Sequence, residues 1–139
     1  MLGNLIGEST GRITGVKILD AAGDQSKLEV NFQGQGKLDD VPFTAMCTYW
    51  QEFRSDGVVY GEGDVLLVTP EGEKLWWKGF GVGKLTGQGF SASFAPCGSI
   101  QTSSPRFARL NGMAVIGEYD TDEEGNYHWT LWEWKPAKS

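Results

Sequence analysis

The chain has 139 residues, of which 40% are hydrophobic, 22% charged and 12% aromatic, and its formal net charge is −6. This composition excludes a disordered chain, and the length fits a single domain over residues 1–139 with a substantial core. The acidic balance argues against a nucleic-acid partner, which would require a basic face.

The start of the chain and its cysteine content predict a cytoplasmic protein. Residues 1–7 lack the basic start and the long apolar stretch of a signal peptide. No run approaches the ~18 apolar residues of a membrane-spanning helix, so we expect no membrane partner. Cys47 and Cys97 are too few for a disulfide scaffold and indicate reduced thiols.

Alternation of apolar and polar residues predicts strands along most of the chain. Residues 27–38 have an apolar side chain at every second position over their first half, which is typical of a strand with one buried face. Short acidic turns that end in Gly, at 55–57, 70–72 and 123–125, join successive strands into hairpins. The predicted strands cover residues 11–19, 27–38, 43–54, 58–69, 73–85, 90–102 (with a break at Pro96), 113–120 and 127–134.

Residues 103–112, between the sixth and seventh strands, predict one helical turn or a tight loop. Ser104 can cap the turn, Pro105 suits its first position, and Gly112 can end it. All eight strands are otherwise joined in sequence, and closure of such a meander removes exposed strand edges. The sequence therefore predicts an all-β fold, a closed eight-stranded antiparallel meander barrel.

Turn chemistry decides which strand faces point into the predicted barrel. A three-residue hairpin with Gly in the left-handed region pairs Thr69 with Glu73, and therefore Gly63 with Gly79. A two-residue turn would shift the register by one residue and bury the Asp64 carboxylate, which costs free energy when the charge is unpaired. The favoured register gives an outer face that carries Glu52, Arg54, Glu62, Asp64 and Lys78.

Glycines on neighbouring strands face the interior in this register, and two interpretations of them remain open. They can permit the strong coiling of a small barrel, with large side chains filling the gap. Alternatively they can form a ligand cavity, because eight strands enclose room for side chains or for one small ligand. Val at both Gly63 and Gly79 is then expected to fill the cavity. The inward glycines are Gly61, Gly63, Gly79, Gly81 and Gly83.

We expect the lumen to hold one small, mostly apolar molecule. Aromatic walls with a few hydrogen-bonding groups are typical of a small-molecule pocket. We expect no metal, since His128 is the single histidine, and no other cofactor, since residues 79–83 lack the dinucleotide spacing. The candidate ligand-binding residues are Tyr49, Gln51, Phe53, Trp77, Arg109 and Asn111.

Glu118 is the candidate catalytic residue. A buried Glu has a raised pKa and can act as a general acid or base. Arg109 can instead neutralise it in a structural pair. The function classes left open are a binding barrel without chemistry, a cofactor-free cyclase or isomerase, and a structural barrel with a filled core.

The last predicted hairpin is apolar on both faces. Trp129 and Leu131 share one face, and Trp132 and Trp134 share the other. An apolar outer face usually requires a cover, so we expect a homodimer or homotrimer.

Six motifs are spread over most of the chain: Asp56-Gly57, Tyr60-Gly61-Glu62-Gly63, Gly79-Phe80-Gly81-Val82-Gly83, Gln101-Thr102, Arg109-Leu110-Asn111-Gly112 and Trp132-Glu133-Trp134. With these motifs the chain resembles a group of small uncharacterised bacterial proteins whose barrels are similar to those of plant allene oxide cyclases. The resemblance implies a closed eight-stranded meander with a cavity, in a dimer or trimer. The cyclases bind an unsaturated fatty-acid epoxide in the lumen, but their catalytic residues have no one-for-one match here. Ala95-Pro96 also stands where the bacterial group is expected to carry Arg-Gly, which weakens the case for a shared anion site at that strand.

Overall fold

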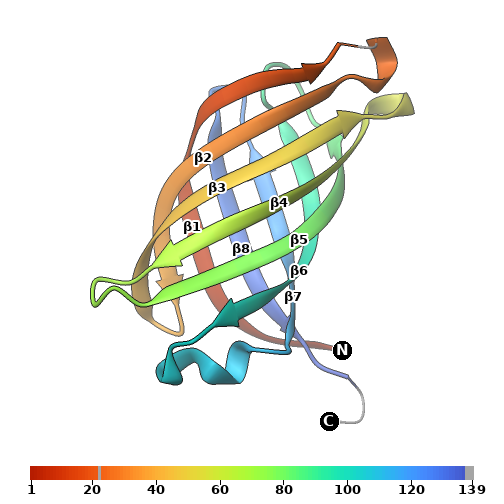
Figure 1. The fold of residues 1–139 in the computed structure, drawn as a ribbon. Helices are drawn as coiled ribbons and strands as arrows, with labels where there is room; N and C mark the ends of the chain where they lie inside the picture. Colours follow the sequence, from red (N-terminus) through yellow and green to blue (C-terminus); the bar gives the residue numbers. More distant parts are fainter. Residues whose placement is uncertain (22, 137–139) are drawn as a thin grey trace.

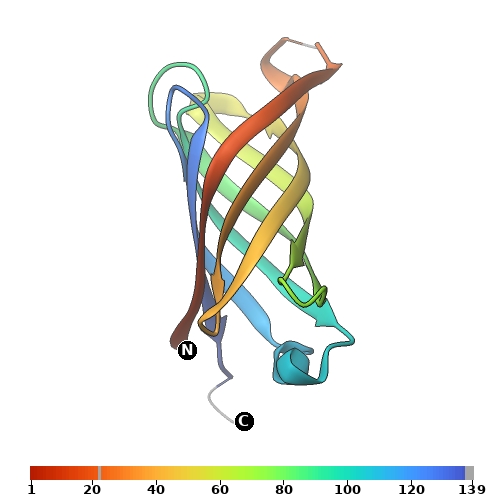
Figure 2. The same cartoon turned by 90° about the vertical axis from the view of Figure 1, so that its left-hand side faces the viewer.

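The computed structural model describes residues 1–21 and 23–136 and shows a closed barrel (Figure 1). Each strand pairs antiparallel with its neighbours in sequence, and the last strand closes onto the first. The strands run obliquely around the barrel (Figure 2), and the predicted eight-stranded meander is confirmed. The strands are β1 (Leu2–Asp20), β2 (Lys27–Leu38), β3 (Val41–Phe53), β4 (Val58–Val68), β5 (Lys74–Leu85), β6 (Ala92–Thr102), β7 (Ala114–Thr121) and β8 (Asn126–Trp134). The short 3-10 helices are η1 (Gly23–Gln25), η2 (Ser55–Gly57) and η3 (Pro105–Leu110).

The predicted register of the β4–β5 hairpin is confirmed. The Thr69 N–H donates to the Glu73 carbonyl at 3.0 Å, and Gly72 has a φ of 84°. Gly63 consequently lies opposite Gly79, with the charged residues of this hairpin on the outer face. The local turn chemistry therefore fixes which side chains enter the lumen.

β1 begins at Leu2, much earlier than the predicted start at residue 11. Its first half pairs with β8, for example Leu5 with Trp132, and carries two register shifts before Gly7. Each bulge moves the following side chains to the opposite face, so the period of two is lost in the sequence. This is why the pattern did not predict a strand there.

The predicted break at Pro96 is confined to one side of β6. Pairing with β7 is interrupted at Ala95 and Pro96, whereas Gly81 of β5 still pairs with Pro96. Proline has no N–H to donate to a ladder, so it locally weakens one of the two pairings without ending the strand.

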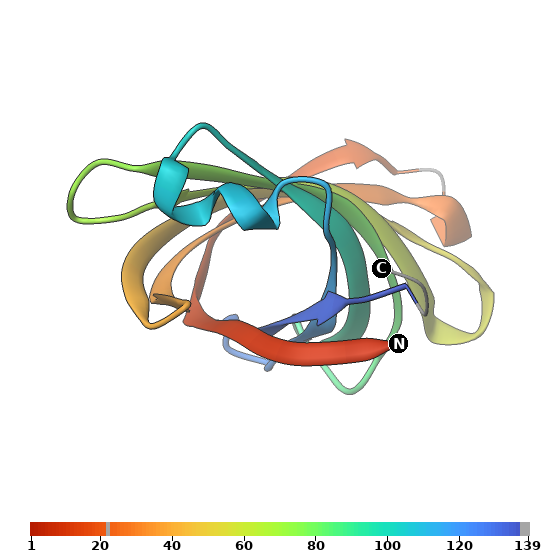
Figure 3. The same cartoon turned by 90° about the horizontal axis from the view of Figure 1, so that it is seen from below.

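η3 lies across one side of the lower rim of the barrel (Figure 3). Phe107 and Leu110 of this helix are fully buried and belong to the hydrophobic core. Pro105 occupies the first turn as predicted, but the Ser104 hydroxyl makes no capping bond and donates to the Glu73 carboxylate instead. No helix in the described residues is long and apolar enough to cross a membrane.

Candidate functional site

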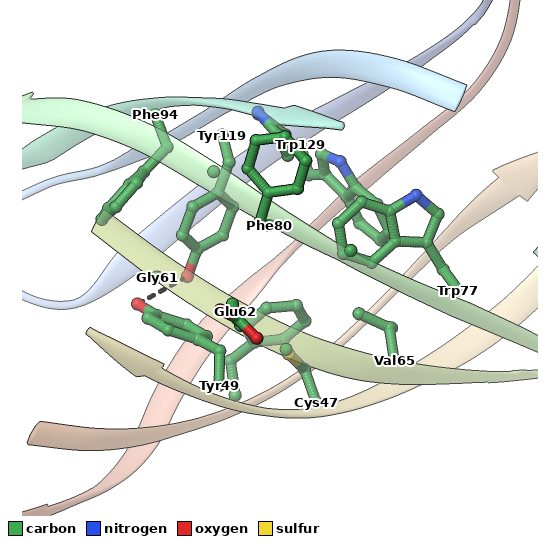
Figure 4. A pocket seen from close by; sticks show the side chains of 15 residues that line it. Cys47, Tyr49, Gly61, Glu62, Val65, Trp77, Phe80, Phe94, Tyr119 and Trp129 are labelled. Carbon is green, nitrogen blue, oxygen red and sulfur yellow. Dashed lines mark hydrogen bonds between the residues drawn. The ribbon is translucent and has the colours of Figure 1, made fainter. Parts of the chain in front are cut away.

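A cavity of about 60 Å³ lies inside the barrel and is lined by residues of β2 to β8 (Figure 4). Its lining is almost entirely apolar, and aromatic rings from strands on opposite sides of the barrel form most of its wall. The aromatic residues on the inner face are Phe32, Tyr49, Trp77, Phe94, Tyr119 and Trp129.

The wall that β4 and β5 contribute is backbone, because their inward positions here are glycines. A Cβ added at Gly63 would lie 2.5 Å from the Tyr49 Cβ, and one at Gly79 would lie 2.3 Å from the Cys97 carbonyl oxygen. These two positions therefore require glycine for close approach, and Val there would distort the barrel, contrary to our expectation that it would simply fill the lumen.

Gly81 differs from its neighbours. It is buried and lines the cavity, yet the atom nearest to a Cβ added there, the Cα of Pro96, lies 3.4 Å away. That is an ordinary contact distance, so a side chain would fit at Gly81. Close backbone approach thus explains Gly63 and Gly79, whereas Gly81 borders open space.

Trp77 covers the glycine backbone on the β5–β6 side of the lumen. Its ring comes within 2.8 Å of the position that a Cβ would take at Gly79 and within 2.7 Å of that at Gly98. Its ring packs edge-on against Trp129, with centroids 5.3 Å apart. The buried indole Nε1 has no hydrogen-bond partner among the described residues. Buried donors are rarely left unpaired, so this N–H marks a place where an acceptor is missing.

Two phenol groups meet across the cavity. The Tyr49 and Tyr119 hydroxyl oxygens lie 3.3 Å apart, and the two rings pack edge to face with centroids 5.8 Å apart. Burial raises the pKa of both phenols above the ordinary value of 10.0. Burial likewise raises the pKa of the Cys47 thiol beside them. These groups are consequently neutral at neutral pH, so they can donate hydrogen bonds to the cavity without bringing a charge to it.

The predicted ligand-binding residues of β3 are spread along the strand. Tyr49 lines the cavity together with Trp77, whereas Gln51 points inward beyond the lining residues. Phe53 lies further along, half-buried, in a wide polar hollow between η1 and η2. The structure therefore brings together Tyr49 and Trp77 from the predicted set.

Arg109 and Asn111 lie at the lower end, outside the cavity lining. The Arg109 guanidinium donates to both Asp39 carboxylate oxygens at 2.6 Å. The Asn111 side chain bonds the Thr102 backbone, accepting from its N–H at 2.9 Å and donating to its carbonyl at 2.9 Å. Both residues hold the segment around η3 in place at the lower end of the barrel, so they do not contact the cavity in which we expected the ligand.

Glu118 is exposed on the outer face of β7, and no ion pair joins it to Arg109 in the described part of the chain. The carboxylate that is buried is Glu133, on the inner face of β8 at the lower end. It accepts the Asn4 N–H at 3.1 Å, and this bond together with nearby Lys135 lowers its pKa. The alternation that places Ile116 on the outer face also places Glu118 there, so the sequence pattern already indicated an exposed Glu118.

Sequence reasoning also missed Tyr119 as a cavity residue. Alternation along residues 113–120 places Tyr119 on the inner face with Val115, but only the structure shows that its hydroxyl meets that of Tyr49. Over residues 1–21 and 23–136, no group of three or more His, Cys, Asp or Glu side chains is placed to hold a metal ion.

No protein-family model matches the chain, and no curated protein matches it in sequence. Its fold is nevertheless shared by solved structures. A conserved protein of unknown function from Rhodopseudomonas palustris has a TM-score of 0.79 at 13% identity, over 96% of this chain and 97% of that one. A β-barrel-like protein from Acinetobacter baumannii has a TM-score of 0.78 at 14% identity, over 96% of each chain. An enzyme from Penicillium herquei has a TM-score of 0.66 at 15% identity, over 92% of each chain. At these identities the likeness shows the barrel fold alone.

Proposed function

We propose that the barrel binds one small, mostly apolar molecule in its interior cavity. The observation that supports this most directly is Gly81, where the wall has room for a side chain and none is present. Protein interiors are normally packed to the density of organic crystals, and unfilled apolar space forfeits contacts. The aromatic walls offer a ligand apolar surface, and the tyrosine pair offers a point of orientation.

The cavity volume limits the part of a ligand that fits. An engineered cavity of about 150 Å³ binds benzene, and one water needs about 10–15 Å³. At about 60 Å³, the cavity therefore accepts a compact group of a few heavy atoms or the end of a longer molecule. Ligands close to benzene in size, such as cyclopentene and cyclopentanone, require rotation of the lumen aromatic side chains.

Gly81→Val tests the location of the site. The added methyl groups should fill the cavity, weaken binding of cyclopentene at least tenfold, and leave the free energy of unfolding unchanged or higher. Binding is measured by amide shifts of the cavity glycines in titrations followed by NMR. Gly15→Val is the matched control, because a Cβ there lies 3.7 Å from its nearest neighbour and Gly15 does not line the cavity.

Two results would contradict the proposal. If Gly81→Val binds cyclopentene as tightly as the parent protein, the ligand site lies elsewhere. If the parent protein shows no saturable shifts with any small apolar probe, the barrel is a structural one with a filled core.

A cofactor-free cyclase or isomerase acting on the same molecule is the second candidate. The cavity contains neutral phenols that can donate a proton, and the structural neighbour from Penicillium herquei is described as an enzyme. The resemblance to allene oxide cyclases belongs to this candidate. Because Glu118 lies outside the lumen, we expect Glu118→Gln to keep any turnover and Tyr119→Phe to reduce it.

We also propose that the protein forms a homodimer or homotrimer. Leu5 of β1 pairs with Trp132 of β8, and the exposed Leu2 and Trp134 extend this apolar strip on the outer surface. A second copy of the chain would cover it. Light scattering at micromolar concentration tests the proposal, and a mass of 15.2 kDa would contradict it.

A further inference from the structure

The hydroxyl groups of Tyr49 and Tyr119 carry two protons but share one hydrogen bond. No other atom in the described part of the chain bonds to either oxygen. When one hydroxyl donates to the other, the second keeps a proton that has no acceptor. The raised pKa of both phenols keeps both protons in place at neutral pH.

Tyr127 shows what a fully satisfied phenol looks like in the same barrel. Its hydroxyl oxygen lies 2.8 Å from the Ser9 Oγ, and Ser9 in turn donates to the Gln35 carbonyl at 3.1 Å. Because the Ser9 proton is used in that bond, Tyr127 is the donor to Ser9. Both protons have acceptors, so this pair is structural, in contrast to the pair of Tyr49 and Tyr119.

The indole N–H of Trp77 is a second donor without an acceptor. Trp77 lines the same cavity, is 6% exposed, and its Nε1 has no partner within the described residues. A buried donor that bonds neither protein nor water costs free energy, whereas an acceptor supplied by a ligand recovers it. The residues that line the cavity therefore carry donors in excess of their acceptors.

None of the described residues that line the cavity carries a positive charge to balance an anion. The one charged residue of its lining, Glu62, is exposed on the outer face of β4 and is acidic. An anionic group in this apolar space would lose its hydration without gaining a counter-charge. The acceptor that matches the spare donors is therefore neutral.

From these observations we infer that the ligand is a neutral molecule with an apolar body and an acceptor oxygen, such as a ketone, lactone or ether. Its oxygen accepts the spare proton of the Tyr49–Tyr119 pair. This inference rests on the proposed ligand-binding function and specifies the class of ligand.

Cyclopentanone and cyclopentene, which are similar in size, test the inference. In Tyr49→Phe/Tyr119→Phe, we expect the affinity for the ketone to fall about tenfold and that for the alkene to stay unchanged. Comparing each probe between variants cancels the difference in hydration between the probes. Each single Phe variant should retain ketone binding, because the remaining hydroxyl still has a free proton.

Two further measurements support the test. The infrared carbonyl stretch of bound cyclopentanone should move to lower frequency in the parent protein, which reports the hydrogen bond without any mutation. Tyr127→Phe is the control variant, because the Tyr127 hydroxyl already donates its proton to Ser9. This variant should change ketone affinity less than twofold.

The outcomes separate the inference from the function on which it rests. If both probes bind the parent protein and the double variant weakens them equally or not at all, the inference is wrong and the binding function stands. If neither probe gives saturable shifts at the cavity glycines, the binding function itself is wrong. Should the double variant fail to fold, an unshifted carbonyl stretch in the parent protein overturns the inference.

Discussion

The lower end and the middle of the barrel interior are built by the same strands but are filled differently. At the lower end, β4 and β5 direct Leu67 and Leu75 inward, η3 adds Phe107 and Leu110, and none of the four is more than 1% exposed. In the middle, the same two strands have glycines at their inward positions. The aromatic rings of the other strands do not fill this space, and the cavity remains.

This difference separates the part of the barrel that stabilises it from the part that can bind. Leucine side chains and the buried residues of η3 fill the lower end. Glycines let the backbones of β3, β4, β5 and β6 approach closely in the middle, at the cost of side chains that would fill the lumen. A small barrel can hold a cavity because its stability is concentrated elsewhere.

The largest effect should come from the packed end. Leu75→Ala removes a fully buried side chain from the lower core and should lower the free energy of unfolding by about 2–5 kcal/mol. Leu66→Ala, on the outer face of β4, is the control and should cost clearly less. Urea denaturation measures both. Equal losses would show that the lower end is not the stabilising part.

The glycines of β4 and β5 that line the cavity should differ in whether they tolerate a side chain. Gly63→Ala forces a Cβ to within 2.5 Å of the Tyr49 Cβ, and the resulting backbone shift should cost about 1–3 kcal/mol. Gly81→Ala should leave stability unchanged or raise it by up to about 1 kcal/mol, because the side chain fits and restricts the unfolded chain. Similar losses in thermal unfolding for both variants would contradict this distinction.

The sequence predicted the fold because its signals are local. Alternation and turn type determine strand faces and hairpin register within a few residues, as the pairing of Gly63 with Gly79 shows. The early half of β1 escaped prediction because its bulges break the alternation before Gly7.

The site was harder to predict because it depends on contacts across the lumen. Tyr49 on β3 and Tyr119 on β7 belong to strands that do not pair, so their contact depends on barrel closure and stagger rather than on any local pattern. The prediction that Glu118 is a buried carboxylate failed for a different reason. Glu133 shares the inner face with Trp129 and Leu131, and strict alternation would have identified it as the buried carboxylate.

The lower end should also respond to pH through Glu133. Its pKa is lowered chiefly because the Asn4 N–H donates to the carboxylate, with Lys135 and Arg109 adding positive charge. A lowered folded pKa means that this stabilisation is complete above the unfolded value of about 4.3 and is lost as pH falls through the folded pKa.

Glu133→Gln should therefore reduce stability at pH 7 by less than Gly63→Ala does, because the amide oxygen can still accept the Asn4 N–H. The variant should also lose less stability than the parent protein between pH 5 and pH 2. Denaturant midpoints across this pH range measure the difference, with Glu118→Gln, an exposed carboxylate, as the control. Parallel pH profiles for Glu133→Gln and the parent protein would contradict the role of this carboxylate.

Chemical modification of the two cysteines should report how accessible the middle of the barrel is. We expect little effect on stability. Cys47 is buried against the cavity, and burial together with the charge of Asp64 raises its pKa, whereas Cys97 is half-buried and pairs with Phe80 on the outer face. Because the thiolate is the reactive form, a small maleimide should modify Cys97 well before Cys47 in the native protein.

Cys97→Ser isolates the slow reaction of Cys47, and mass spectrometry follows it. If a ligand-sized opening leads to the cavity, Cys47 should react without global unfolding, at a rate that does not change with low concentrations of urea. Gly81→Val should then slow the modification of Cys47 further, because the valine fills the cavity that both residues line. Modification of Cys47 that accelerates with urea in proportion to global unfolding would mean that the cavity is closed in the native state, and that a ligand enters only when the barrel opens.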